Sequence, residues 1–134
     1  MCCLIQVSLS LKELTNLFKA LSDNTRLRVV NLLRMQSLSV GDLQAVLGLP
    51  QPAVSQQLAI LRAAKLVRAK RQGHRICYSL SRAPFLNYPV SRFLSEVAPF
   101  FPELAADAQK LVDFKGDSSS CSQQDEERTR SGQV

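Results

Sequence analysis

The sequence contains no tryptophan, one histidine and only 6% aromatic residues. With so few aromatic side chains, the core has to be built from Leu, Val, Ile and Ala, which suits packed helices better than a β-sandwich. The chain also lacks a run of the roughly 20 apolar residues that a membrane-spanning helix needs. A secretion signal would require a Lys or Arg before its apolar run, and none precedes the short apolar run in residues 1–10. We therefore expect a mainly helical, cytoplasmic protein with no membrane partner.

Cysteines are few, irregularly spaced and never arranged as C-x-x-C. The four residues Cys2, Cys3, Cys77 and Cys121 are too few and too irregular for a disulfide framework, so we expect free thiols or ligands in a reducing compartment. The sequence has a single histidine, no glycine-rich phosphate loop and no nucleophile paired with a base. It therefore offers few groups that could act in catalysis. The sequence indicates that the protein is not an enzyme.

Acidic residues are scarce in the first part of the chain. Residues 1–82 carry 12 Lys and Arg against 3 acids, a net charge of +9, whereas residues 83–134 carry 5 against 8, a net charge of −3. Clustered Lys and Arg bind polyanions because they release condensed counterions from phosphates. The asymmetry favours a nucleic-acid partner, although many basic proteins bind nothing in particular.

Apolar residues at helical spacing predict amphipathic helices. We expect helices over residues 9–21, 25–35, 39–47, 51–66, 90–98 and 102–112. In the second of these helices, we expect Arg26, Arg28 and Arg34 on the outside. Asp23 or Ser22 is the expected cap of the second helix, and Ser39 with Asp42 approaches a capping box. Gly48 is the expected end of the third helix, and the turn it opens joins two short helices as in a helix-turn-helix.

The periodicity changes from helical to alternating after residue 66. One face of the expected β-hairpin carries Val67, Ala69, Ile76, Tyr78 and Leu80, and the other carries Arg68, Lys70, Arg75 and Cys77. Gly73 allows the positive φ that the bend between the strands needs. A helix-turn-helix followed at once by a basic hairpin predicts a winged helix-turn-helix, mainly α with a small β-hairpin.

The boundaries of this domain follow from composition. We expect a flexible N-terminus at 1–8, one DNA-binding and dimerisation domain at 9–113, and a disordered polar tail at 114–134. Apolar residues of the last helices exceed what so small a domain can cover: Phe93, Leu94, Val97, Leu104, Ala108 and Leu111. Together with the first helix, this excess predicts a homodimer through the first and last helices.

Two stretches resemble a known family. "ALSDNTRLRVVNLL" and "DLQAVLGLPQPAVSQQLAILRAAKLVRAKRQGHRICYSL" look like the ArsR/SmtB family of bacterial winged-helix transcriptional repressors, over roughly residues 14–82. The resemblance implies a homodimer bound to double-stranded operator DNA that overlaps a promoter, and released when an inducer binds.

The expected recognition helix and the basic hairpin supply the candidate DNA-binding residues. Exposed residues near the start of a recognition helix reach base edges in the major groove, where Gln pairs with adenine. Cations of the hairpin contact phosphates, because the sequence offers no acid between Asp42 and Glu96 to neutralise them. The candidates are Gln51, Ala53, Ser55, Gln56, Gln57, Arg62, Arg68, Lys70, Arg71, His74 and Arg75. A solvated helix face is the plainer interpretation of the Ser and Gln residues, and a surface turn that of His74.

The metal sites common in the resembled family are missing. Where family members that sense metals often have a cysteine pair, this sequence has Val40, Gly41 and Asp42. Residues 84–112 contain no histidine. Cys2 and Cys3, with Cys121 as a third thiol, remain as candidates for arsenite or a soft metal ion, because thiolates favour soft ions. The alternatives are thiols without a specific role and a regulator that senses neither metal nor thiol chemistry. For Cys77 we expect a packed or passive place in the hairpin.

Overall fold

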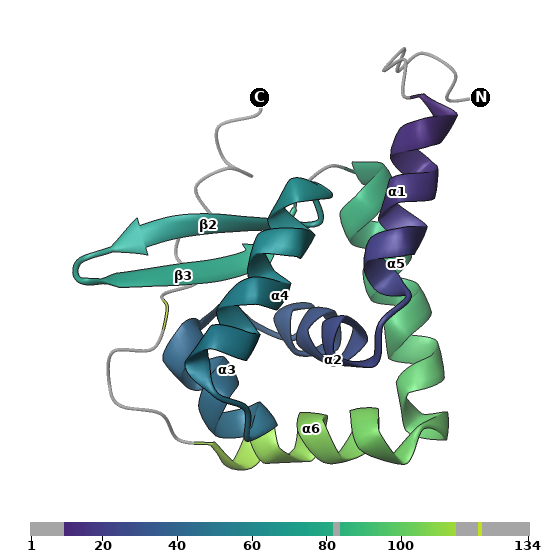
Figure 1. Ribbon diagram of the computed structural model, residues 1–134. Helices are drawn as coiled ribbons and strands as arrows, with labels where there is room; N and C mark the ends of the chain where they lie inside the picture. Colours follow the sequence, from purple (N-terminus) through teal and green to yellow (C-terminus); the bar gives the residue numbers. More distant parts are fainter. Residues whose placement is uncertain (1–9, 82–83, 115–120, 122–134) are drawn as a thin grey trace, which may run out of the picture.

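The computed structural model describes residues 10–81, 84–114 and 121 (Figure 1). In chain order the elements are α1 (Leu11–Leu21), α2 (Asn24–Leu33), β1 (Leu38–Ser39), α3 (Val40–Leu47), α4 (Gln51–Ala63), β2 (Val67–Gln72), β3 (Arg75–Leu80), α5 (Pro84–Val97), the 3₁₀ helix η1 (Ala98–Phe100) and α6 (Pro102–Asp113). None of the helices in this part of the chain is long and apolar enough to cross a membrane. The expectations for residues 1–8, 115–120 and 122–134 lie outside the described residues.

Side-chain caps start the first three helices, and those of the second and third were predicted. Ser10 and Glu13 form a capping box at α1, and Asp23 accepts from the Arg26 backbone N–H at the start of α2. Ser39 and Asp42 form the second capping box, which confirms the expected start of α3. Each cap satisfies backbone N–H groups that have no partner in the first helical turn.

The expected hairpin is part of a three-stranded sheet in the order β1-β3-β2. β2 and β3 are antiparallel, with Val67 opposite Leu80 and Ala69 opposite Tyr78, so these residues share one face as predicted. β1 adds Leu38 opposite Tyr78. A strand of two residues shows no alternation in the sequence, and the sequence did not predict it.

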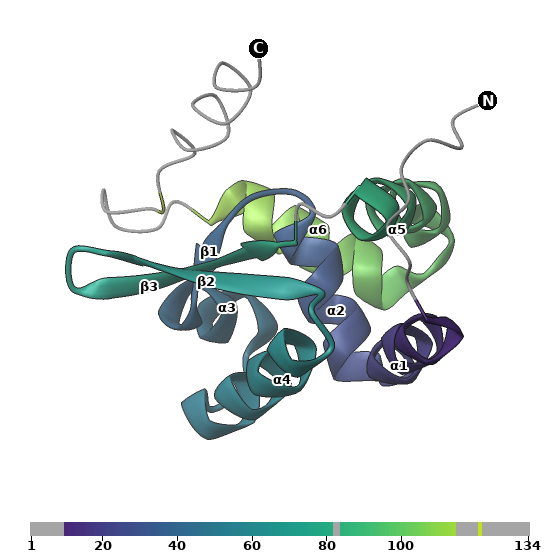
Figure 2. The same cartoon turned by 90° about the horizontal axis from the view of Figure 1, so that it is seen from above.

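The wing, residues 67–80, extends from one end of the molecule, and α1 and α5 lie at the other end (Figures 1 and 2). Between them α2 is the central helix, and its residues 29–33 are all buried. The core is aliphatic, as the composition predicts, and its fully buried large side chains include Leu32, Leu38, Leu43, Leu58, Leu61 and Leu66.

An ion pair fixes α6 to α2. Arg28 donates to both carboxylate oxygens of Asp107, from Nε to Oδ2 at 2.7 Å and from Nη2 to Oδ1 at 2.9 Å. The hydrogen bond to Asp107 raises the pKa of Arg28 above its ordinary value, although partial burial opposes the shift. The sequence predicted Arg28 on the solvent side of α2. The structure corrects this, because α6 covers that side.

Part of the predicted apolar excess is buried within the chain itself. Leu94, Leu104 and Leu111 are 2%, 8% and 4% exposed, and α6 packs on α2 and α3. On α1 and α5, at the end opposite the wing, the large apolar residues Leu11, Leu14, Phe18 and Phe93 stay exposed. α5 also begins earlier than the sequence predicted, at Pro84, and contains Pro89.

Candidate nucleic-acid interface

The α3–α4 pair has the geometry of a helix-turn-helix. Gly48 ends α3 with φ +68°, a left-handed conformation that glycine adopts without strain, and Pro50 precedes the first residue of α4. Val54, Leu58 and Leu61 anchor α4 to the core on one side. Their spacing of four and three residues turns the opposite side of α4 to solvent.

The predicted base-reading residues divide into two groups in the structure. Gln51, Ser55 and Gln56 are exposed in the first turns of α4, and Ala53 is half-buried beside them. Gln57 is also half-buried, and its Oε1 accepts a hydrogen bond from Arg26 Nη1 at 2.9 Å.

Arg26 is a positioning residue that sequence reasoning missed. Its Nε donates to the backbone oxygen of Ala20 at 2.6 Å while its Nη1 holds Gln57, so one guanidinium joins the end of α1 to the recognition helix α4. The sequence placed Arg26 on the outside of α2. The helical register places Gln57 next to the buried Leu58, which could have indicated that Gln57 is partly buried. No sequence pattern, however, predicts its contact with Arg26, which is 31 positions away.

The wing presents its cations along both strands and the turn. Arg68 Nε donates to Ser79 Oγ at 3.0 Å across the strands, and Arg71 Nε donates to the Gly73 oxygen at 3.2 Å in the turn. These bonds orient guanidinium groups that remain exposed. Lys70 and His74 are exposed as well, Arg75 is half-buried, and Arg62 is exposed in the last turn of α4.

The recognition helix and the wing form one cationic surface. α4 contacts β2, and the wing extends beyond α4 in both views (Figures 1 and 2). The sequence between Asp42 and Glu96 has no acidic residue, so no carboxylate from this stretch neutralises the surface. Such a surface attracts polyanions over a range set by ionic strength.

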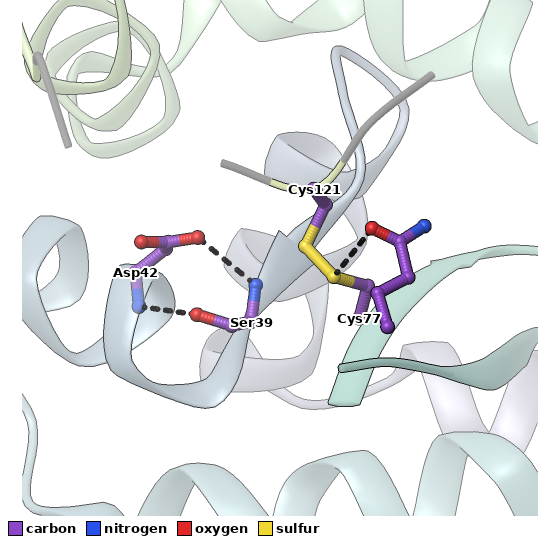
Figure 3. Close-up of a disulfide and its surroundings, with 5 residues drawn as sticks. Ser39, Asp42, Cys77 and Cys121 are labelled. Atoms are coloured by element: carbon purple, nitrogen blue, oxygen red, sulfur yellow. Dashed lines mark hydrogen bonds between the residues drawn. A yellow bond between two sulfur atoms is a disulfide. The ribbon is translucent and has the colours of Figure 1, made fainter. Parts of the chain in front are cut away.

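Cys77 and Cys121 form a disulfide, which corrects two expectations from the sequence (Figure 3). These residues are not free thiols, and Cys121 has no thiolate to offer a metal ion together with Cys2 and Cys3. Sequence spacing could not reveal the pair, because the two cysteines are 44 positions apart and only the fold brings their Cα atoms to 5.9 Å.

The described residues contain no group of three or more His, Cys, Asp and Glu that could hold a metal ion. Cys2 and Cys3 lie outside those residues.

Comparison with known proteins agrees with this geometry. A family model described as "Bacterial regulatory protein, arsR family" matches residues 23–69. The chain is 40% identical over 76 residues to the transcriptional repressor SmtB homolog of Synechocystis sp.. This match covers 57% of this chain and 58% of that protein. It is 35% identical over 68 residues to the transcriptional repressor SdpR of Bacillus subtilis, covering 51% of this chain and 76% of that repressor.

Among solved structures, the crystal structure of the transcriptional repressor BigR from Xylella fastidiosa matches with a TM-score of 0.57 at 33% identity. That match covers 67% of this chain and 87% of BigR. All three of these relatives are named as transcriptional repressors. The winged helix-turn-helix fold and these matches together show that the chain belongs to the ArsR family of bacterial regulatory proteins.

Proposed function

We propose that this protein is a transcriptional repressor that binds double-stranded operator DNA as a homodimer. One observation supports this most directly: exposed, uncharged polar residues at the start of α4 stand beside a cationic wing with no acid between Asp42 and Glu96. Amide and hydroxyl groups distinguish base pairs, and cations bind phosphates regardless of sequence. The names of the matched relatives as repressors agree with this proposal.

In this proposal the start of α4 enters the major groove. Gln51, Ser55 and Gln56 reach base edges, where a Gln amide can both donate to and accept from adenine. Ala53 is small enough to let the helix approach the bases closely and can contact a thymine methyl group. Gln57 holds the helix on Arg26 and contributes through the orientation of α4.

The wing and the end of α4 bind the sugar-phosphate backbone. Arg68, Lys70 and Arg71 contact phosphates, and Arg62 reaches the backbone from the last turn of α4. Arg75 and His74 lie at the wing turn, the part of a winged helix that can approach the adjacent minor groove. These contacts fix the register of α4 on the duplex and make the affinity depend on salt.

The homodimer joins two copies through α1 and α5. Leu14 and Phe18 on α1 and Phe93 on α5 are exposed at 46%, 62% and 62%, and α1 and α5 lie opposite the wing. Covering these side chains with a second copy removes apolar surface from water and leaves both wings pointing outward. Two recognition helices about 34 Å apart then read successive major grooves.

An inducer releases the dimer from DNA in this proposal. Cys2 and Cys3 are adjacent thiols that could bind arsenite or a soft metal ion, or react with a thiol-reactive species. The test is the Cys2→Ser, Cys3→Ser double variant in a release assay with arsenite, zinc and a persulfide donor. Undiminished release by the same inducer would leave a repressor that does not sense through these thiols.

The proposed DNA binding is tested with the full chain and a pool of random duplexes at low salt. We expect repeated selection to enrich a sequence with two related half-sites. A chain that retains no duplex at low salt would instead favour a winged helix that uses its wing for protein contacts, since a fold alone does not determine function.

A further inference from the structure

The Cys77–Cys121 disulfide lies where the wing loses the support of the third strand. β1 pairs with β3 only at Tyr78 and Cys77, so Cys77 is the last residue toward the tip with a paired strand on both sides. Beyond it, residues 71–76 form a two-stranded ribbon, and a two-stranded hairpin by itself is marginally stable in water. A bond at Cys77 therefore acts on the part of the sheet that determines how rigidly the tip is held.

The disulfide is on the face of the sheet that turns away from the core. Cys77 shares its face with its cross-strand neighbours Ser39 and Lys70. The neighbouring row on the opposite face includes Leu38, which is 1% exposed in the core. Cys77 is nevertheless only 3% exposed, and its partner Cys121 is 7% exposed. The sulfur–sulfur bond, drawn in Figure 3, thus fixes Cys121 to a residue that lies directly opposite the wing cation Lys70 in the sheet.

A disulfide of this kind has a specific meaning in a DNA-binding protein. Such a protein works beside DNA, where thiol pools keep cysteines reduced and disulfides are mostly transient or redox-sensing. We propose that Cys77–Cys121 is a reversible redox site through which thiol–disulfide exchange sets the rigidity of the wing and hence the affinity for DNA. This proposal rests on the proposed DNA-binding function.

The reductant is a thiol or dithiol, and the step is a two-electron exchange. A thiolate attacks Cys121, which is the more exposed of the two cysteines, and forms a mixed disulfide as the bond to Cys77 breaks. A second thiol attacks the mixed disulfide, so that two protein thiols and one reductant disulfide result. The reduced Cys77 can donate to Gln72 Oε1, which lies 3.7 Å from Cys77 Sγ. An oxidised thiol or an equivalent two-electron oxidant reverses the step.

The oxidised form is the tighter DNA binder. With the bond closed, Cys121 is fixed to the wing, and α6 is fixed to α2 by Arg28 and Asp107. The wing is then ordered before DNA arrives. Reduction leaves the two-stranded ribbon to be ordered on binding, and we expect a loss of about fivefold, the equivalent of immobilising one or two long side chains.

The test measures binding of the full chain to its selected duplex in glutathione buffers of different oxidation state. Alkylation of free thiols followed by mass spectrometry reports the state of the bond in each sample. We expect the reduced chain to bind about fivefold more weakly, with a salt slope lower by about 1 because a wing phosphate contact is lost. Preference among base-substituted duplexes should stay unchanged, since α4 is not altered.

Two sets of variants identify the cysteines responsible. Cys121→Ser removes the bond without changing a strand residue, so it should bind as the reduced form does in every buffer. Cys77→Ser should give the same result, and the Cys2→Ser, Cys3→Ser variant should keep the full redox response. Loss of the response in the latter variant would contradict the assignment to Cys77 and Cys121.

Failure of the redox proposal can be distinguished from failure of DNA binding. Equal affinity of the two forms, or tighter binding by the reduced form, would overturn the redox proposal and leave the repressor proposal in place. Absence of any duplex binding by the fully oxidised chain and by the fully reduced chain would overturn both.

Discussion

Arg28 and Asp107 form a two-point ion pair between α2 and α6 over a separation of 79 residues. The Asp107 side chain is 2% exposed and that of Arg28 is 23% exposed, so the pair is mostly shielded from water. We expect Asp107→Asn to lower the free energy of unfolding by about 1–3 kcal/mol, because it leaves a half-buried guanidinium without its counter-charge. Urea denaturation followed by circular dichroism measures this loss.

The exposed pair of Arg92 and Glu96 provides the control for this prediction. Its side chains are 67% and 65% exposed, and the two residues are one helical turn apart on α5. Glu96→Gln should change the free energy of unfolding by no more than about 0.5 kcal/mol. Equal losses for Asp107→Asn and Glu96→Gln would show that α6 is not held by its ion pair.

The turn before the recognition helix depends on a left-handed glycine. Gly48 has φ +68°, and Gly48→Ala should destabilise the protein by about 1–2 kcal/mol because a Cβ disfavours this conformation. Gly41 is a matched control in α3, where an added Cβ would meet only Ser39 Oγ at 3.8 Å. Gly41→Ala should stabilise the protein by about 0.4–1 kcal/mol. Thermal unfolding should show a lower midpoint temperature for Gly48→Ala and a higher one for Gly41→Ala. Midpoints that shift in the same direction in both variants would refute the explanation.

The two parts of the DNA interface should respond differently to substitution. Gln56→Ala should relax preference at one base pair by about 1–3 kcal/mol, because an exposed amide at the start of α4 is lost. Arg71→Ala should weaken binding to all duplexes and lower the salt slope by about 1. Titrations of base-substituted duplexes over a range of salt measure both effects. Unchanged preference in the first variant and an unchanged slope in the second would refute these assignments.

The exposed apolar residues of α1 should determine the oligomeric state. Phe18 is 62% exposed on α1, and Phe18→Glu should shift the protein toward monomer because it places a charge in the proposed interface. Ile76→Glu is the control, since Ile76 is 48% exposed on the wing. Sedimentation equilibrium over a range of concentrations measures both. A dimer that is weakened as much by Ile76→Glu as by Phe18→Glu would place the interface elsewhere.

Local sequence signals predicted most of the fold. The caps at Asp23 and Ser39, the left-handed Gly48 and the wing turn at Gly73 each depend on a few neighbouring residues. The alternation in residues 67–80 matched the observed register, because side chains in a strand alternate between two faces. The exposed positions at the start of α4 followed from its apolar spacing in the same way.

The features that the sequence did not predict depend on residues far apart in the chain. Arg28 and Arg26 were expected on the solvent side of α2, but Asp107 and Gln57 are brought to them by packing. The Cys77–Cys121 bond likewise depends on where the fold places Cys121, 44 positions from Cys77. Helical and strand periods describe which side of an element is apolar, and they contain no information about which distant element covers it.

The guanidinium of Arg26 has a consequence for the length of the proposed operator. It contacts the Ala20 oxygen at the end of α1 and the Gln57 amide of α4, so one side chain joins the proposed dimer helix to the reading helix. Together with the packing of α1 and α4 on α2, this connection holds the angle between the two reading helices of the proposed dimer. A repressor built in this way tolerates few inserted base pairs at the centre of its palindrome, because neither helix can swing independently to follow its half-site.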